Sequence, residues 1–145
     1  MISRTGVHAI KAVASLAELE QGVFAGANEI AERTGAPPNY LGKLLKTLAE
    51  EGILVSQKGK NGGFRLARDP QSISLHDVMD PIEHVSRWRG CFLGRDQCSD
   101  TAPCAVHRQW GRIRDSYLQF LKQTTISDLA AHRETRPAAG EPNAG

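Results

Sequence analysis

The sequence predicts a mostly α-helical protein with a small β-hairpin wing, that is, a winged helix–turn–helix followed by a long C-terminal dimerisation helix. Three observations lead to this fold class. A short expected helix at 28–34 and a leucine-rich expected helix at 39–51 flank a short proline-containing turn, which is the pattern of a helix–turn–helix. A glycine-rich turn between two short apolar runs then predicts a hairpin. Residues 105–123 carry apolar side chains at heptad-like steps, which is typical of a helix that packs against another helix.

The expected elements follow in order along the chain. Five helices are expected, over 5–20, 28–34, 39–51, 75–79 and 105–123. Apolar side chains recur every three or four residues in the first and the last, and leucines form one side of the third. The two strands and their connecting turn are expected at 53–55, 64–67 and 58–63. Ala27 or Asn28 is the expected cap of the second helix. Gly52 is expected to end the third helix, and Ser74 to cap the fourth.

Composition and charge exclude several classes of protein. Apolar residues make up 40% and charged residues 23% of the 145 residues, as in a globular protein large enough to bury a core. No apolar run approaches the roughly 18 residues of a membrane span, and residues 1–11 lack the apolar stretch of a signal peptide. We therefore expect a cytoplasmic protein that does not contact a membrane. Three cysteines, an odd number, argue against a complete disulfide framework.

The helix–turn–helix and the hairpin carry the candidate DNA contacts. The second helix of such a unit enters the major groove with its first residues nearest the base edges, and a hairpin tip can reach phosphates or the minor groove. The residues expected to contact DNA are Asn39, Tyr40, Lys43, Lys58, Lys60, Asn61 and Arg65. Residues 35–68 hold six Lys or Arg against two Glu, a local charge of +4 in a chain of net charge +2. The alternative is a helix–turn–helix that serves a protein–protein contact, with the cations as solvated surface.

All three cysteines lie in one short segment, Cys91-x6-Cys98-x5-Cys104, and His107 follows after two further residues. Three thiols and an imidazole in one stretch can surround a metal centre, and thiolate suits iron–sulfur clusters, zinc or Cu(I). Zinc sites usually contain a Cys-x2-Cys pair, which is absent from this sequence, so the long gaps favour an iron–sulfur cluster over zinc. Two alternatives stay open: a thiol switch without metal, and three buried, inert cysteines.

Histidine supplies the candidate fourth ligand. Cys104 and His107 lie three residues apart at an expected helix start, so they share a face. The alternative fourth ligand is His8 on the first helix, which in a dimer can reach the cysteine segment of the partner subunit. His84 is also near in sequence. Taken singly, each of these histidines is more often an ordinary surface or core histidine than a metal ligand.

The helix–turn–helix, the hairpin and the cysteine segment occur in an order that resembles one bacterial family. The resemblance extends from about Met1 to Leu129. The stretches that carry it are Tyr40-Leu41 with Leu44, Lys58–Phe64, Ile73–Val78 and the three cysteines. On these residues the chain resembles the Rrf-two (BadM-type) family of winged-helix transcription regulators.

The resemblance implies a homodimer that binds palindromic operators in double-stranded DNA and holds an iron–sulfur cluster on the cysteine segment. The implied cluster ligands are Cys91, Cys98, Cys104 and His107. The implied dimer interface is the stripe of the long helix, formed by Val106, Trp110, Ile113, Tyr117 and Phe120. The Cys104-x2-His107-x2-Trp110 arrangement is similar to the branch of the family that holds [2Fe–2S], which we favour. The x6 gap departs from that branch and both His8 and His107 are available, so [4Fe–4S], which other branches hold, stays an alternative. Gly42 stands where many members present a larger polar side chain to the operator, so the operator preference of that branch is not implied.

Together these features predict a DNA-binding transcription regulator that senses iron, redox state or nitric oxide through an iron–sulfur cluster. The alternative is a zinc- or thiol-based regulator without such a cluster. An enzyme is not expected, because the sequence has no P-loop, no dinucleotide fingerprint and no evident nucleophile–base set. The expected organisation is a DNA-binding unit over 1–83, a cysteine segment over 84–104, a dimerisation helix with a C-terminal segment over 105–130 and a disordered tail over 131–145.

Overall fold

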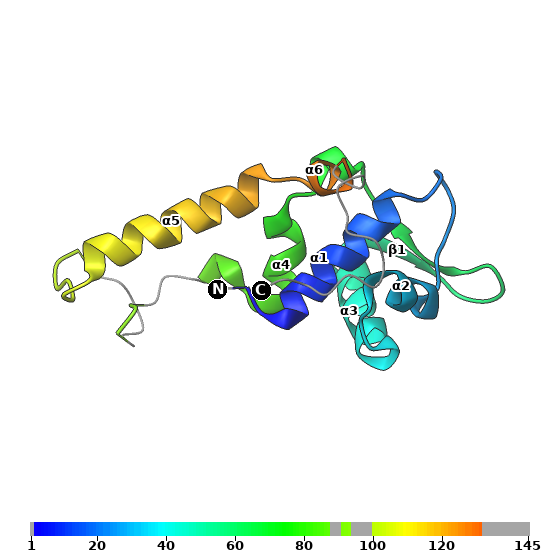
Figure 1. The fold of residues 1–145 in the computed structure, drawn as a ribbon, viewed down its shortest axis with the longest axis horizontal. Coiled ribbons are helices and arrows are strands. Elements are labelled where there is room, and N and C mark those ends of the chain that lie inside the picture. Colours follow the sequence, from blue (N-terminus) through cyan, green and yellow to red (C-terminus); the bar gives the residue numbers. More distant parts are fainter. Residues whose placement is uncertain (1, 88–90, 94–99, 132–145) are drawn as a thin grey trace, which may run out of the picture.

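The computed structural model describes residues 2–87, 91–93 and 100–131. These ranges are mostly helical and contain a two-stranded antiparallel hairpin, so the expected fold class is confirmed (Figure 1). The elements are α1 (Arg4–Ala17), α2 (Ala27–Thr34), α3 (Pro38–Glu50), β1 (Leu54–Gln57), β2 (Gly63–Leu66), η1 (Pro70–Ser72), α4 (Leu75–Glu83), η2 (Val85–Arg87), α5 (His107–Gln123) and α6 (Ile126–Ala130). Cys98 and residues 132–145 of the expected tail lie outside the described residues.

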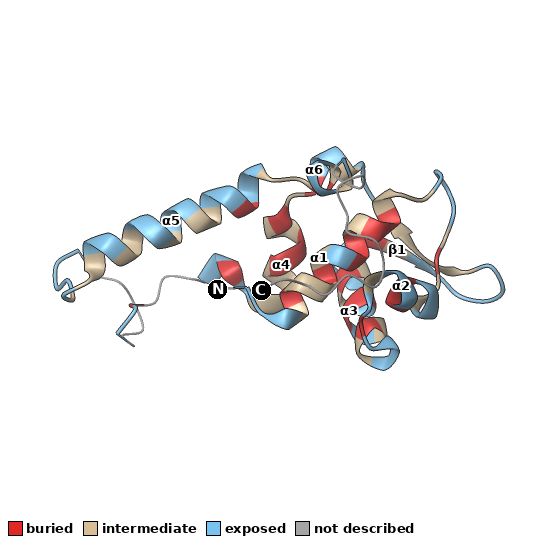
Figure 2. Cartoon of the chain, viewed as in Figure 1, coloured by how far each residue is buried: buried red, intermediate tan, exposed pale blue. Residues whose placement is uncertain are grey.

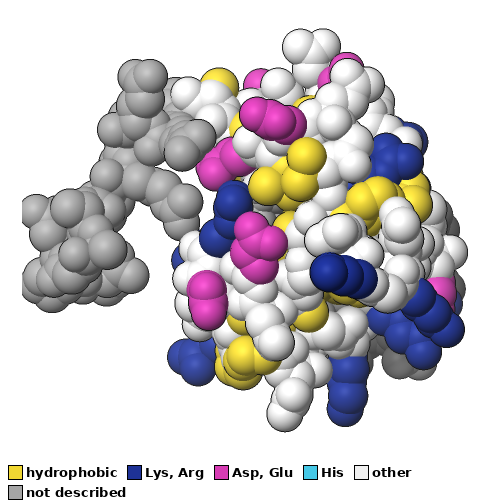
Figure 3. Space-filling model, turned by 90° about the vertical axis from the view of Figure 1, so that its right-hand side faces the viewer, with side chains coloured by type: hydrophobic (Ala, Val, Ile, Leu, Met, Phe, Trp, Pro, Cys, Tyr) yellow, Lys and Arg dark blue, Asp and Glu magenta, His cyan; other side chains and the backbone are white. Residues whose placement is uncertain are grey.

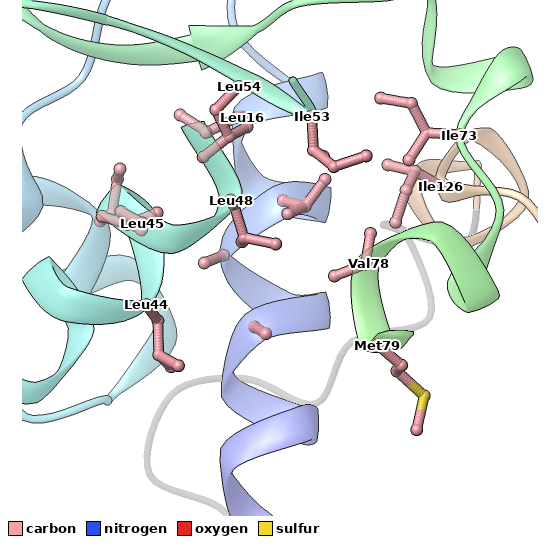
Figure 4. Close-up of a cluster of buried hydrophobic side chains, with 14 of the residues drawn as sticks. Leu16, Leu44, Leu45, Leu48, Ile53, Leu54, Ile73, Val78, Met79 and Ile126 are labelled. Atoms are coloured by element: carbon pink, nitrogen blue, oxygen red, sulfur yellow. The ribbon is translucent and has the colours of Figure 1, made fainter. Parts of the chain in front are cut away.

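Helix α1 lies at the centre of the helical body, which we define as α1, α2, α3, α4 and α6. Its inner face consists of small side chains, and Ala9, Ala12 and Val13 are fully buried. Because these side chains are small, α2, α3, α4 and α6 all pack directly against α1. Figure 4 shows α1 between α3 and α4, with the buried side chains of the core filling the space between the three helices. Full burial of each leucine or isoleucine in this cluster stabilises the fold by about 1.5–3 kcal/mol.

Glycines, rather than polar residues, mark both ends of α2. Gly26 occupies the N-cap with extended backbone, so the expected caps Ala27 and Asn28 are wrong. Ala27 instead begins the helix. At the other end Gly35 takes the left-handed conformation, with φ at 75°, and reverses the chain toward α3.

The caps of α3 and α4 follow local sequence rules closely. α3 begins at Pro38, which suits the first helical turn because its missing N–H would have no helical acceptor. Its C-cap is Glu51, one residue before the expected Gly52, which follows at φ 79°. Ser74 caps α4 as predicted. Asp77 completes the capping box, with hydrogen bonds of 3.0 Å in both directions.

Helix α4 extends beyond the expected end at Met79. It continues through Pro81 for one further turn. Asp80 holds this turn with two acceptor groups: its carbonyl accepts from His84 N–H at 2.8 Å, and its carboxylate accepts from Ser86 N–H at 2.8 Å. These two hydrogen bonds, from residues that follow Pro81, hold the last turn of α4 in place after the proline.

The hairpin is fixed to the body at its base. β1 and β2 each begin one residue from the predicted position, and they pair antiparallel with Leu54 opposite Leu66. Phe64 exchanges backbone hydrogen bonds of 2.8 and 2.9 Å with Ala25 in the loop before α2. Gly63 is required at this crossing, because its φ is 135° and a Cβ atom would lie 2.3 Å from the carbonyl oxygen of Ala25. The orientation of the hairpin is thus set by the helical body.

Helix α5 projects from the body as an extended arm (Figure 1). It begins at His107, two residues later than expected, and Leu121 is its one buried residue. Exposed and half-exposed surface runs along most of its length (Figure 2). No helix in the described ranges, including this one, is long and apolar enough to span a lipid bilayer.

Helix α6 returns the chain to the body. The carbonyl of Thr124 accepts from Leu75 N–H at 2.9 Å, and Ile126 N–H donates to the carbonyl of Ile73 at 2.9 Å. Ile126 is fully buried against α1 and its neighbours. This helix is absent from the sequence prediction because five residues show no measurable period; the capping box that begins at Thr125 is the signal that marks it.

Candidate DNA interface and cysteine site

Helix α3 presents a polar face outward because its leucines face the core. The buried residues are Leu41, Leu44, Leu45 and Leu48. Asn39 and Lys43 lie on the exposed side near the start of the helix. Tyr40 is half-buried, and its ring stands edge-on to the His8 ring of α1 at 5.9 Å between centroids. Asn39 and Lys43 are therefore open to a duplex, whereas Tyr40 also packs between α3 and α1.

Gly42 leaves the outward side of α3 uncovered. No atom lies within 4 Å of the position that a Cβ atom would take there. The fold itself has room for a side chain, and a glycine inside a helix costs about 1 kcal/mol relative to alanine. Because Gly42 has no side chain, the backbone of α3 can approach a binding partner closely at this position.

The wing, which we define as β1, β2 and their connecting turn, has an exposed tip and a packed base. Lys58, Lys60 and Asn61 are all exposed at the tip. Arg65 is half-buried at the base, with its guanidinium carbon 5.2 Å from the centroid of the Phe24 ring. Its Nε atom is buried and has no hydrogen-bond partner among the described residues. Arg65 therefore supports the base of the wing, in contrast to the cations at the tip.

Charge is unevenly distributed at the end of the molecule that carries α2, α3 and the wing. Figure 3 views this end: most Lys and Arg side chains lie along its right-hand and lower edges, and most Asp and Glu lie toward the upper left. Two of its arginines pair with carboxylates, each at 3.5 Å. Lys43, Lys58 and Lys60 form no ion pair with another described residue, so their charges are available to phosphate oxygens.

Two of the three cysteines meet at the outer end of α5. The Sγ atoms of Cys91 and Cys104 lie 3.2 Å apart, which is longer than the roughly 2.05 Å of a disulfide bond. Leu93 N–H donates to the Sγ of Cys91 at 3.4 Å. Cys91 is buried, with 9% of its surface exposed, and Cys104 is half-buried. Residues thirteen positions apart in the sequence thus bring their sulfur atoms into direct contact. Their role as ligands of one centre stays a prediction.

His107, the first residue of α5, is held by a carboxylate. Its Nε2 atom lies 2.8 Å from Oδ1 of Asp100, and its side chain is 21% exposed. Such a carboxylate–imidazole pair is the usual support of a metal-ligating histidine, because it fixes the ring orientation and the tautomer. Sequence reasoning missed Asp100; an acidic residue inside a cysteine–histidine segment is the signal that finds it.

The donor set fits an iron–sulfur cluster or another thiophilic metal centre. Cys91 and Cys104 bring two soft sulfur donors together, and the contact of His107 with Asp100 is made through its Nε2 atom. Within the ranges that the structure describes, no three His, Cys, Asp or Glu residues converge on one point. Cys98, the remaining predicted ligand, lies outside those ranges.

His8, the predicted alternative ligand from a partner subunit, packs inside its own chain. Its ring contacts Tyr40, and its Nδ1 atom is buried without a hydrogen-bond partner among the described residues. This contact joins α1 to the helix that carries the expected base contacts. Ligation by His8 of the partner subunit stays a prediction.

The predicted dimer stripe is exposed at two of its five positions, in the middle and near the inner end of α5. Ile113 and Phe120 are 53% and 52% exposed, respectively. Val106, Trp110 and Tyr117 are half-buried. Tyr117 packs against the core of the body, so the stripe reaches the body at this residue. Burial, with a smaller contribution from the charge of Glu83, raises the pKa of Tyr117. The arm therefore carries an apolar face that residues 2–87, 91–93 and 100–131 leave partly uncovered.

Comparison with known proteins decides the family. Residues 2–132 match the sequence pattern of Rrf2, described as an iron-dependent transcriptional regulator. The chain belongs to the Rrf2 family. A helix–turn–helix-type transcriptional regulator of Aquifex aeolicus is 34% identical over 131 residues, which cover 89% of this chain and 90% of that relative. The regulator IscR of Escherichia coli is 28% identical over 112 residues, which cover 77% of this chain and 68% of IscR.

Solved structures of Rrf2-family proteins have the same fold. The structure of IscR from T. potens matches with a TM-score of 0.75 at 25% identity, covering 97% of this chain and 93% of that one. The structure of CymR (YrzC), the global cysteine regulator of B. subtilis, matches with a TM-score of 0.76 at 25% identity, covering 91% and 97%. This Rrf2-family chain is therefore a winged-helix, DNA-binding transcription regulator and not an enzyme, and the predicted family is confirmed.

Proposed function

We propose that this Rrf2-family chain is a homodimeric regulator that binds palindromic operator DNA and senses iron, redox state or nitric oxide through an iron–sulfur cluster. The observation that carries the proposal is the contact between the Sγ atoms of Cys91 and Cys104, 3.2 Å apart, beside a carboxylate-supported His107. The name IscR among its relatives and the description of the family as iron-dependent support the same class of sensor. [2Fe–2S] is the favoured cluster, with [4Fe–4S] as the alternative.

The duplex is bound by α3 and the wing. Asn39 and Lys43 enter the major groove, where amide and ammonium groups read base edges or bind phosphates. Lys58, Lys60 and Asn61 at the tip of the wing contact the flanking backbone or the minor groove. Arg65 acts through its contact with Phe24, which holds the wing against the body.

The cluster is held by Cys91, Cys98, Cys104 and His107. When bound, it supplies a centre that changes its charge or composition with iron supply, oxidation or nitric oxide. Leu93 N–H donates to the Cys91 sulfur, and such hydrogen bonds tune cluster potentials. Asp100 fixes the ring of His107 through Nε2.

A chain of contacts joins the cysteine site to the DNA-binding body. α5 starts at His107, and Tyr117 in its second half lies near Glu83 at the end of α4. Glu83 in turn accepts from Ser3 N–H at 3.0 Å and from the Ser3 hydroxyl, at the start of α1. A change in the orientation of α5 therefore acts on α4 and α1 together, and a coupling of only about 1.4 kcal/mol changes DNA affinity tenfold.

Anaerobic purification tests the sensor. We expect a coloured protein whose visible absorption, iron and acid-labile sulfide are lost together in Cys98→Ala, and whose iron-to-protein ratio separates [2Fe–2S] from [4Fe–4S]. His107→Ala tests the fourth ligand, and His8→Ala tests the alternative. A colourless protein that stays without iron after reconstitution contradicts the sensor proposal and leaves a DNA-binding regulator.

Operator binding is tested separately, as Kd against salt concentration. Lys58→Ala and Lys60→Ala are each expected to weaken binding and to lower the slope of log K against log salt by about 1. Lys122→Ala, on the far side of α5 from its apolar stripe, is the matched control with the same change of charge. Equal slopes for wing and control variants would exclude the wing lysines as phosphate contacts.

A zinc- or thiol-based regulator is the second candidate function. The two sulfur atoms that favour it are the same pair, because two adjacent thiolates also suit zinc or a reversible disulfide. Stoichiometric zinc in a colourless protein supports the zinc form. A colourless, metal-free protein whose DNA affinity responds to thiol oxidation supports the thiol form.

A further inference from the structure

A charged hollow lies beside Cys104. It measures about 670 Å³, and its lining includes Cys104, His107, Arg108 and Arg112, together with the carboxylates of Asp100 and Asp115. Asp100 contacts His107 and Asp115 pairs with Arg114, so each carboxylate already has a partner. Both arginines are exposed, and neither forms an ion pair with a residue in the described part of the chain. Arg114 nearby differs, since it pairs with Asp115 at 3.3 Å. The hollow therefore places two available guanidinium groups next to a half-exposed thiol.

The position of these arginines is unfavourable without an anion. Arg108 and Arg112 are four residues apart on one helix face, where like charges repel. Arg108 also lies in the first turn of α5, which contains no acidic residue, although the N-terminal end of a helix favours negative charge. At about 100° per residue, both side chains lie on the side of α5 opposite the apolar stripe. An anionic group bound in the hollow would relieve this repulsion and would not compete with a partner helix on the stripe.

The two cysteines differ in access. Cys104 lines the open hollow, whereas Cys91 is 9% exposed and lies behind it with its Sγ atom 3.2 Å away. In thiol–disulfide exchange, access decides which sulfur reacts first, and a neighbouring thiol then displaces the mixed disulfide. The arrangement is that of an entry thiol and a resolving thiol.

We propose that, when no metal centre occupies the site, Cys104 and Cys91 form a dithiol that exchanges with disulfides of small anionic thiols bound by Arg108 and Arg112. The Cys104 thiolate attacks one sulfur of the small disulfide, forming a mixed disulfide and releasing one small thiolate. The Cys91 thiolate then attacks the Sγ of Cys104, forming the Cys91–Cys104 disulfide and releasing the second small thiolate. The protein dithiol loses two electrons, the small disulfide gains them, and the two thiol protons pass to the released thiolates or to water.

This reaction rests on the proposed function in one respect: the two thiols react only when they do not ligate the cluster. Its product removes two of the proposed cluster ligands. Formation of the disulfide therefore blocks reloading of the site until a reductant restores both thiols. The site acquires a second input, the thiol–disulfide balance, beside the state of the cluster.

The test uses the full-length chain, stripped of metal by a chelator, reduced, and mixed with oxidised glutathione at low salt. Intact-mass and peptide analysis are expected to show a glutathionyl group on Cys104 first and a Cys91–Cys104 disulfide afterwards. In Cys91→Ser the adduct on Cys104 is expected to accumulate. Cys104→Ser is expected to react at least about tenfold more slowly, because the remaining thiol of the pair is buried.

The recognition of charge by the two arginines is tested separately. Arg108→Glu/Arg112→Glu is expected to slow exchange with oxidised glutathione by about tenfold or more, with the difference shrinking at high salt. The same variant is expected to keep its rate with the uncharged 2-hydroxyethyl disulfide, and Lys122→Glu to keep both rates. Equal effects on the charged and uncharged disulfides would overturn the anion site, and a first adduct on Cys91 or Cys98 would overturn the assigned order of attack.

The outcomes separate this reaction from the sensor proposal. Iron and sulfide in the anaerobic protein without exchange in the stripped protein would overturn only the dithiol reaction. Exchange as described in a protein that never binds iron would support the dithiol reaction and remove only the cluster.

Discussion

The helical body and the α5 arm differ in how far they bury their apolar residues. In the body, α1 alone contributes Ala9, Ala12 and Val13 at full burial, and α3 contributes four buried leucines. In the arm, Leu121 is the one buried residue of α5, while Ile113 and Phe120 remain about half exposed. The body is therefore stabilised by its own chain, whereas the arm has an apolar face that lacks a cover within the described chain.

This difference indicates a division of roles. The body holds α3 and the wing in a fixed relation, because Ala25 binds the hairpin and His8 contacts Tyr40. The arm carries the cysteine site at its outer end and rejoins the body through Leu121 and α6. The body and the arm therefore require different tests: unfolding measures the body, and self-association measures the arm.

The largest expected effect is on the body. Leu48→Ala removes a fully buried side chain from the core between α1 and α3, and we expect the free energy of unfolding to fall by about 2–5 kcal/mol. Val23→Ala, at a loop position that is 43% exposed, is the matched control and is expected to stay within about 0.5 kcal/mol. Urea unfolding followed by circular dichroism measures both. Similar losses for the two variants would contradict the tight core assigned to the body.

Next comes the arm. Ile113→Asp/Phe120→Asp places two charges on the exposed stripe, and we expect dimer dissociation to become at least about 100-fold more favourable, or about 2.7 kcal/mol. Sedimentation equilibrium measures the dissociation constant. The control is Gln119→Asp, on the opposite side of α5, with unchanged association expected. If the double variant stays as dimeric as the parent while its helix content is unchanged, the stripe is not the dimer interface.

The comparison also explains how far the sequence could predict the molecule. The turn before α3 and the tip of the wing are predictable because prolines and glycines act within a few residues. The sulfur atoms of Cys91 and Cys104 do lie in contact, as their closeness in sequence allows, while their role as ligands of one centre stays a prediction. By contrast, the contact of Glu83 with Ser3 joins residues 80 positions apart, and α6 depends on backbone pairing with the loop before α4. No local periodicity encodes such contacts.

The Glu83 contact gives the third prediction, at the junction between body and arm. Glu83→Gln weakens the hydrogen bonds to the backbone and hydroxyl of Ser3 at the start of α1, so we expect a loss of about 1–2 kcal/mol in the free energy of unfolding. Glu50→Gln, at the exposed end of α3, changes the same charge without this contact and is the control. If the junction transmits the state of the arm, Glu83→Gln also reduces the difference in operator affinity between cluster-loaded and cluster-free protein. An unchanged difference would restrict Glu83 to a structural role.

The smallest effect is expected where the chain leaves α4 for the cysteine segment, and it depends on pH. Partial burial raises the pKa of Asp80, but the hydrogen bonds from Ser86 and the nearby His76 and His84 outweigh it, so the pKa is lowered in the folded protein. A lowered folded-state pKa stabilises the fold above the unfolded pKa of about 3.9, and this contribution is lost as the pH falls through the folded value. Asp80→Asn is therefore expected to cost about 1 kcal/mol or less near pH 6, with the difference from the parent shrinking below about pH 4. The measurement is chemical unfolding at the two pH values. Glu20→Gln, on an exposed loop, is the control, and its free energy of unfolding should not converge with that of the parent at low pH. If the difference in free energy between Asp80→Asn and the parent is the same at both pH values, the charge of the Asp80 carboxylate contributes nothing to this turn.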